Sequence, residues 1–216
     1  AGMFAIMTDL EHQPRSYHHG DLRRALIDAA LTLLAEEGGW SFSIRELARR
    51  AGVSHSAPNK HFPTKRDLLT ALAGVGFDML RDRMLTESAG VEPADLALAA
   101  TGVAYVQFAV ENQALYRLMF GPELAGKAMP DETEAAGIGA KSVLEDAILH
   151  AAKAGQLRFS ADDQHARSVA ALTCWSAVHG LAMLLIEGKA PASSSAGMLA
   201  GAMVANLMTG LRRQAP

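Results

Sequence analysis

The chain of 216 residues contains one cysteine, Cys174, and this residue lies within an apolar run. A single cysteine excludes disulfide bonds within the chain, and such usage is typical of a reducing cytosol. The first sixteen residues have no secretory pattern and are expected to form a disordered arm. We therefore expect a cytoplasmic protein.

Sequence signals of catalysis are also missing. No pair of histidines has the spacing of zinc ligands, and Cys174 has no basic neighbours that would activate its thiol. The segment GIGAKS at residues 137–142 is an incomplete phosphate-binding loop with no strand before it, so we expect it within a helix. The sequence predicts neither an enzyme nor a bound metal or cofactor.

Acidic residues outnumber basic residues over the whole chain, whose net charge is -3, but the N-terminal region differs. Residues 18–66 hold eight Lys or Arg and five Asp or Glu, whereas residues 67–216 hold eleven and sixteen. A basic region in an acidic protein is expected where only that region meets phosphates.

Residues 43–69, SIRELARRAGVSHSAPNKHFPTKRDLL, have the pattern of two short helices around a tight turn, followed by a longer helix. Ser43 with Glu46 predicts a capping box at the start of the first helix. Gly52 supplies the positive φ that ends it, and Ser54 is expected to cap the next helix. This order predicts a helix-turn-helix, an arrangement that enters the DNA major groove.

The second short helix consists mainly of hydrogen-bonding residues rather than core residues. We assign Lys65, Ser43 and Ser54 to phosphate contacts and the residues of the second helix to base edges. The alternative is a generic pair of amphipathic helices with solvated charged faces. The complete set of predicted DNA-binding residues is Ser43, Arg45, Ser54, His55, Ser56, Asn59, Lys60, His61 and Lys65.

No segment has the convincing alternation of a strand, and we expect an all-α chain of about nine helices. Thr64 with Asp67 begins a long helix that extends to about Ser88. Ser160 with Asp163 is expected to cap the next-to-last helix. The other helices are expected at about residues 21–37, 94–111, 114–120, 132–154, 161–187 and 196–213.

The last two predicted helices are unusually apolar. Nineteen successive residues between Arg167 and Glu187 carry no Asp, Glu, Lys or Arg, and residues 196–211 are likewise uncharged. A helix that is apolar on nearly all sides must be buried on nearly all sides. One explanation is a membrane-associated helical hairpin, and the better one is a four-helix interface between two copies of the chain. The interface residues would be Gly180, Leu184, Gly197, Gly201 and Val204.

Three stretches carry a family resemblance. Residues Tyr17–Leu69 include HHGDLRRALIDAA and then AGVS, HF and a following Lys at characteristic spacing. Residues 116–124 read YRLMFGPEL, and residues 175–180 read WSAVHG. The first stretch resembles the DNA-binding domain of the TetR family of transcription regulators. The other two resemble the subgroup whose ligand domain is named after a Trp-His-Gly motif. The family usually has Tyr where this chain has Asn59, whose amide can pair with adenine or with a phosphate.

The resemblance implies a homodimeric, ligand-responsive transcription regulator, expected to be a repressor that a small, largely apolar effector releases from a palindromic operator. The implied domains are an arm at residues 1–16, a helix-turn-helix domain at 17–66, and a ligand-binding and dimerisation domain at 67–216. An architectural DNA binder without a ligand is the alternative.

A stripe of large side chains is the candidate ligand site. Trp175, His179 and Met183 are four residues apart and share a helix face with Leu172. Such a stripe can be ordinary core, and His179 can be either a hydrogen-bonding handle or a structural histidine. With the resemblance, we expect it to line a ligand cavity. The facing walls are expected to be Tyr105, Phe108, Tyr116, Met119 and Phe120.

Overall fold

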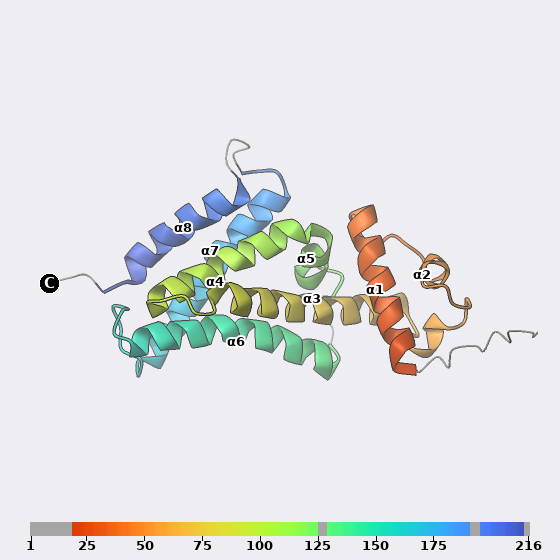
Figure 1. Cartoon of the computed structure of the whole chain (residues 1–216), viewed down its shortest axis with the longest axis horizontal. Coiled ribbons are helices and arrows are strands. Elements are labelled where there is room, and N and C mark those ends of the chain that lie inside the picture. Colours follow the sequence, from red (N-terminus) through yellow and green to blue (C-terminus); the bar gives the residue numbers. More distant parts are fainter. Residues whose placement is uncertain (1–18, 125–128, 191–194, 214–216) are drawn as a thin grey trace, which may run out of the picture.

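The computed structural model describes residues 19–124, 129–190 and 195–213, and every regular element in these residues is a helix (Figure 1). The predicted arm at residues 1–16 lies outside them. The described part confirms the all-α prediction, with eight α-helices and one 3-10 helix, η1. Their bounds are α1 His19–Glu37, α2 Ile44–Arg50, η1 Pro58–Lys60, α3 Lys65–Ser88, α4 Ala94–Glu111, α5 Gln113–Phe120, α6 Asp131–Lys153, α7 Gln164–Ile186 and α8 Ala196–Leu211.

The start of α2 follows the predicted cap only in part. The Ser43 hydroxyl accepts a hydrogen bond from the Glu46 backbone N–H at 3.1 Å. The Glu46 carboxylate does not complete the capping box, because it accepts two hydrogen bonds from Arg49 at 2.9 and 2.6 Å instead. The end of α2 is as expected, with Gly52 at a φ of +67°.

The second helix of the predicted helix-turn-helix is shorter and less regular than expected. The Ser54 side chain caps no helix, and its carbonyl accepts from Ala57 in a turn. Pro58 then begins η1, which has only three residues. Proline lacks a backbone N–H and restricts its own φ, so a continuous α-helix through residue 58 would lose a hydrogen bond. The polar residues are therefore presented by a turn and a 3-10 helix.

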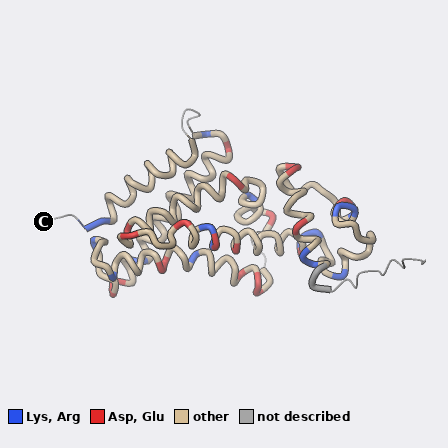
Figure 2. The backbone as a smooth tube through the Cα atoms, viewed as in Figure 1, with Lys and Arg blue, Asp and Glu red and all other residues tan. Residues whose placement is uncertain are grey.

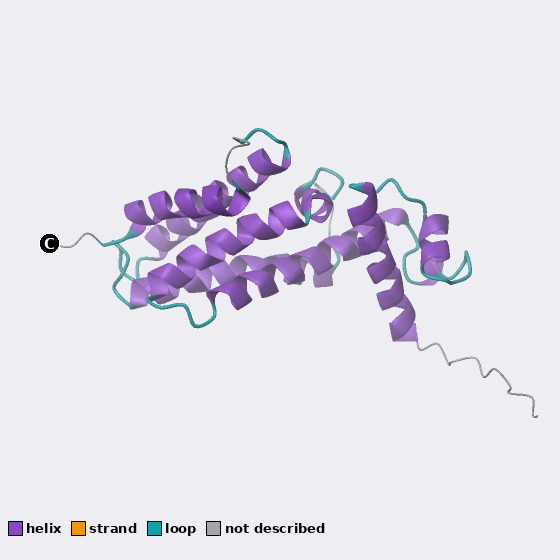
Figure 3. Ribbon diagram, turned by 45° about the horizontal axis from the view of Figure 1, so that its top comes forward, coloured by secondary structure: helices purple, strands orange, loops and turns teal. Residues whose placement is uncertain are grey.

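Helix α3 connects the two ends of the molecule. Thr64 and Asp67 form a complete capping box, in which the Asp67 N–H donates to the Thr64 hydroxyl and the Thr64 N–H donates to Asp67. From there α3 runs unbroken to Ser88, out of the end that holds α1 and α2 and into the bundle of the remaining helices (Figures 1 and 3). The predicted boundary at residue 66 therefore falls in the first turn of a continuous helix.

The larger bundle is organised around α4, which contacts α3, α5, α6, α7 and α8. Helix α3 packs closely on α6 on one side of α4, and α7 and α8 cover another side. Helix α5 lies between this bundle and α1, and it contacts α1, α3 and α4. At Gly76 of α3 there is no room for a side chain, because a Cβ atom would lie 2.6 Å from the Met119 sulfur of α5. The bundle thus reaches the N-terminal helices through α3 and α5.

The start of α7 and the end of α8 differ from the predicted helix limits. Helix α7 begins at Gln164 rather than at about Ala161, because Asp163 caps it by accepting from the Ala166 N–H at 2.9 Å. Ser160 instead accepts from the Asp162 N–H within the preceding turn. Helix α8 stops at Leu211, where the chain leaves to pair with residues 156–158.

The outer face of α7 is exposed in the single subunit, so the expected burial on nearly all sides would need a second copy of the chain. Val169, Leu172, Trp175 and Leu184 are each between 40 and 61% exposed. Among the described helices, α7 alone is both long enough and apolar enough to cross a bilayer, while α8 is shorter. Core helices of water-soluble proteins share this length and composition. The exposed face therefore requires a cover that one subunit does not supply.

Candidate DNA-binding surface and ligand cavity

The predicted DNA-binding residues lie on neighbouring segments at one end of the molecule. They belong to the start of α2, the segment between α2 and α3, and the first residue of α3. In Figure 2, several stretches of backbone at this end are coloured for Lys or Arg. Two of the nine, His61 and Lys65, are half-buried, and the other seven are exposed: Ser43, Arg45, Ser54, His55, Ser56, Asn59 and Lys60.

Ion pairing divides the basic residues of this end into two groups. Arg49 pairs with Glu46 at 2.6 Å, and Arg50 pairs with Glu36 at 2.5 Å. The Arg49 guanidinium lowers the pKa of the Glu46 carboxyl by hydrogen bonding, which keeps that pair charged. By contrast, none of the described acidic residues pairs with three of the predicted contacts, Arg45, Lys60 and Lys65. Their charges are the ones available to phosphates.

The two half-buried residues have specific surroundings. The Lys65 ammonium lies 5.4 Å from the centre of the Phe42 ring, close enough for a cation–π contact. This contact holds the side chain at the start of α3. The His61 Nε2 is buried and has no hydrogen-bond partner among the described residues. One ring nitrogen of His61 therefore points into the protein. This leaves the His61 ring less available to DNA than the exposed side chains among the nine predicted residues.

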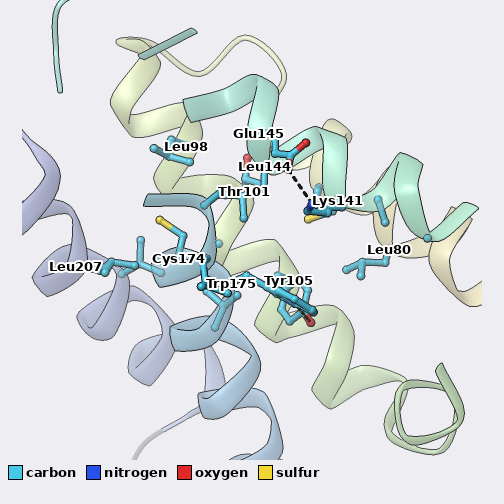
Figure 4. A pocket seen from close by; sticks show the side chains of 18 of the residues that line it. Leu80, Leu98, Thr101, Tyr105, Lys141, Leu144, Glu145, Cys174, Trp175 and Leu207 are labelled. Carbon is cyan, nitrogen blue, oxygen red and sulfur yellow. Dashed lines mark hydrogen bonds and ion pairs between the residues drawn. The ribbon is translucent and has the colours of Figure 1, made fainter. Parts of the chain in front are cut away.

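A cavity of about 460 Å³ lies within the larger bundle (Figure 4). Its walls come from α3, α4, α6, α7 and α8, with one residue from the end of α5. Most lining residues are aliphatic or aromatic. They are Phe77, Leu80, Met84, Leu98, Thr101, Gly102, Tyr105, Phe120, Gly137, Ala140, Lys141, Leu144, Glu145, Ser168, Ala171, Leu172, Cys174, Trp175, Val178, Val204, Leu207 and Met208.

Four of the nine predicted ligand-site residues line this cavity: Tyr105, Phe120, Leu172 and Trp175. The other five lie outside its wall. Phe108, Tyr116 and Met119 are buried in the core, and His179 and Met183 are partly buried on α7.

The walls from α3, α6 and α8 were missed at the sequence level. Ala140, Lys141, Leu144 and Glu145 do recur at helical spacing on α6, and this spacing was the available signal. Spacing identifies an inward face, but it does not tell whether that face meets another side chain or an empty volume.

A hydrogen-bonded cluster joins the cavity wall to the core beside it. The Tyr105 and Tyr116 hydroxyl oxygens are 2.9 Å apart, and they lie 3.0 and 2.7 Å from His179 Nδ1. The Trp175 indole N–H donates to the Tyr105 oxygen at 3.3 Å. Burial raises the pKa of Tyr105 to about 12 and also raises the pKa of Tyr116, while it lowers the pKa of His179. All four side chains are therefore uncharged near pH 7.

The predicted interface residues occupy different positions. Leu184 is 47% exposed, and the α-carbons of Gly180 and Gly201 face open space. Gly197 instead lies near the Gln107 side chain of the same subunit. Val204 is buried and packs against Gly102, so it belongs to the interior of the subunit rather than to its open face.

Comparison with protein families agrees with this architecture. A family model described as "Bacterial regulatory proteins, tetR family" matches residues 26–72. A second, "Tetracyclin repressor-like, C-terminal domain", matches residues 98–207. The chain belongs to the TetR family. It is accordingly a transcriptional regulator of the helix-turn-helix type, as the resemblance indicated, while its place in the Trp-His-Gly subgroup stays a prediction.

Individual relatives of this TetR-family regulator are moderately similar. The chain is 39% identical over 70 residues to the HTH-type transcriptional regulator CymR of Pseudomonas putida, a match of 32% of this chain and 34% of CymR. It thus spans about a third of that curated relative. A solved structure of a protein of unknown function from Rhodococcus sp. RHA1 is 31% identical, with a TM-score of 0.79 over 93% of this chain and all of that one.

A more distant structure shares the fold. The transcriptional regulator FadR from Bacillus subtilis, solved in complex with stearoyl-CoA, has a TM-score of 0.67 and 16% identity. The match covers 87% of this chain and 98% of FadR.

Proposed function

We propose that this TetR-family regulator is a cytoplasmic homodimeric repressor that binds a palindromic operator and is released by a small, largely apolar effector. The observation that carries the proposal is the separation of two sites on one chain. Unpaired cations gather at the end formed by residues 19–66, and an apolar cavity is lined by residues between Phe77 and Met208. The family is one of transcription regulators, and this division matches a DNA-reading unit joined to an effector-binding unit.

The exposed apolar face of α7 supports dimerisation. Leu172, Trp175 and Leu184 would be covered by the same face of a second copy, as a twofold interface requires. Two copies of the reading segment would then address two half-sites about one DNA turn apart. In a membrane the same face would meet lipid, but polar Ser168 and Ser176 are also exposed on α7. Sedimentation without detergent separates these cases, since a monodisperse dimer excludes the membrane hairpin.

Contacts between the bundle and the N-terminal helices supply a route for effector control. Tyr105 in the cavity wall is hydrogen-bonded to Tyr116 of α5, and α5 contacts α1. The Arg66 guanidinium also donates to the Glu123 carbonyl just after α5, at 2.9 Å. A ligand that prefers one arrangement of α4 and α5 would change the spacing of the reading segments and thus DNA affinity.

The cavity favours a small, mainly apolar effector, because its volume and lining are those of ordinary ligand pockets. FadR, which has the same fold, was solved with stearoyl-CoA, a ligand with a long apolar chain. We assign no catalytic step to the cavity.

The decisive experiment is selection of bound fragments from the source genome, followed by affinity measurements on the selected site at several salt concentrations. A repressor binds a palindromic site at least about 1,000-fold more tightly than random DNA. An architectural DNA binder would bind both with similar affinity, and that result would refute the proposal.

A further inference from the structure

The cavity wall is not uniform. Aromatic side chains from α3, α4, α5 and α7 gather on one part of it, where Phe77 and Phe120 pack edge to face and Tyr105 contacts Trp175. Another part is aliphatic and lies between α4, α7 and α8, with Val204 against Gly102. A ligand that fills the cavity is therefore in contact with hydrocarbon on most of its surface.

Charge is confined to the edge of the cavity. The only charged residues in its lining are Lys141 and Glu145, which form an ion pair at 3.0 Å on α6 (Figure 4). Their side chains are 64 and 48% exposed, so both are hydrated and already paired. Deeper in the wall, burial raises the pKa of the Cys174 thiol to about 11, and this thiol stays neutral. An ionised ligand group inside would find no counterion, which makes its burial costly.

The hydrogen bonds within the cluster depend on the tautomer of His179. If neutral His179 accepts at Nδ1, the nearer hydroxyl of Tyr116 donates to it at 2.7 Å. The Tyr105 hydroxyl can then donate to the Tyr116 oxygen at 2.9 Å, so in this tautomer every proton of the cluster has a partner. If His179 instead carries its proton on Nδ1, it donates to Tyr116 and Tyr116 donates to Tyr105. The Tyr105 proton then has no partner in the cluster.

The oxygen of Tyr105 also accepts from the Trp175 indole N–H. With the His179 proton on Nδ1, therefore, Tyr105 is the cluster member in the cavity wall with a proton to offer; with that proton on Nε2, the Tyr105 hydroxyl can turn from the Tyr116 oxygen to a ligand acceptor. Thr101, the hydroxyl residue one turn earlier on α4, is already committed, because it donates to the Ala97 carbonyl at 3.0 Å.

We propose that the effector is an uncharged molecule with an apolar body and a hydrogen-bond acceptor, such as a ketone, ester or amide carbonyl, which accepts from the Tyr105 hydroxyl. This inference rests on the proposed function, in which the cavity is the effector site. It adds the chemical class of the ligand and the residue that recognises its polar group.

The test uses four probes that share a phenylbutyl frame and differ at the polar end. They are butylbenzene, 4-phenylbutan-2-one, 4-phenylbutanoate and 4-phenylbutan-1-amine, which at pH 7.5 are apolar, neutral acceptor, anion and cation. Their dissociation constants for the full chain are measured by calorimetry or by ligand-observed NMR. We expect the ketone to bind roughly tenfold or more tightly than either ion.

The matched variant is Tyr105→Phe, with its fold checked by circular dichroism. We expect the affinity for the ketone to fall roughly five- to tenfold. Butylbenzene makes no hydrogen bond, so its affinity should change less than about twofold and serves as the internal control.

Three results overturn the inference. Ionic probes that bind as tightly as the ketone would show that the cavity tolerates charge. Equal losses for ketone and butylbenzene in Tyr105→Phe would show that the residue only packs. If no probe binds, butylbenzene included, both this inference and the ligand-responsive part of the proposed function fail, whereas operator binding is measured separately and is not affected.

Discussion

The proposed DNA-binding end and the proposed ligand site of this regulator differ in physical form. At the proposed DNA-binding end, charged and polar side chains are exposed, and the distinguishing feature is which cations lack an acidic partner. In the larger bundle, the site is an apolar volume with a small cluster of neutral polar groups beside it. The residue types in the sequence are enough to predict an exposed polar site of this kind. A cavity is harder to predict, because it depends on how closely helices that are distant in the sequence pack together.

The largest effect is expected in the core of the bundle. Tyr116 is completely buried and is bonded to both Tyr105 and His179. Replacing Tyr116 by Ala should lower the free energy of unfolding by about 3–5 kcal/mol, because it leaves a cavity and unpaired polar groups. Denaturant titration measures this loss. The control is Leu172→Ala at an exposed position of α7, measured below the concentration at which subunits associate. A similar loss in both variants would contradict the assignment of Tyr116 to the core.

At the other end, Asn59 tests whether a surface residue reads sequence. The side chain is exposed on η1, where an amide can pair with an adenine edge. Asn59→Ala should cost about 1–3 kcal/mol at one base pair of the operator and little at others. Competition between operator variants checks the position. Uniform weakening over all variants would place Asn59 on the phosphate backbone instead.

A Lys65 variant tests whether the unpaired cations contact DNA phosphates. Lys65→Ala should weaken binding to all sequences and reduce the slope of log affinity against log salt by about one. The matched control is the double variant Glu46→Gln, Arg49→Gln, which removes an ion pair without changing net charge. Its salt slope should stay as in the wild type. If Lys65→Ala leaves the slope unchanged as well, Lys65 is not a phosphate contact.

The smallest expected effect is a pH dependence of stability from His179. Burial lowers its pKa below the ordinary value of 6.5, so the unfolded chain binds this proton at a higher pH than the folded chain. The stability contributed by neutral His179 is therefore complete above pH 6.5 and declines as the pH falls below it. The free energy of unfolding is measured against pH for the wild type and for His179→Gln. The difference between the two profiles isolates the contribution of His179. A difference that does not change between pH 7.5 and 5 would contradict a lowered pKa.

Local signals in the sequence were sufficient for most helix limits. Thr64 and Asp67 lie three residues apart, and their capping box formed as expected because both partners belong to one turn. Pro58 is a further local signal, because it limits the second short helix to the 3-10 helix η1. Errors arose where two nearby residues compete for the same role, as when Asp163 rather than Ser160 caps α7.

Nonlocal features were harder to predict. Tyr105 and Trp175 were assigned to the cavity from residue type and family resemblance, and they do lie in its wall. Tyr116 was assigned to the cavity on the same grounds, but it lies in the core beside the cavity. The difference depends on which faces of α4 and α5 pack together, and helical spacing alone does not determine this.

The unbroken course of α3 has a mechanical consequence. Its 24 residues make a rod about 36 Å long, with the Lys65 end at the DNA-reading surface and Phe77, Leu80 and Met84 in the cavity wall. A tilt of only about 5° about the far end would move the near end by roughly 3 Å, close to the rise of one base pair. In a dimer, the two copies of α3 would tilt in opposite directions. The distance between their Lys65 ends would then change by twice as much, while the spacing of the half-sites on a rigid DNA duplex stays fixed.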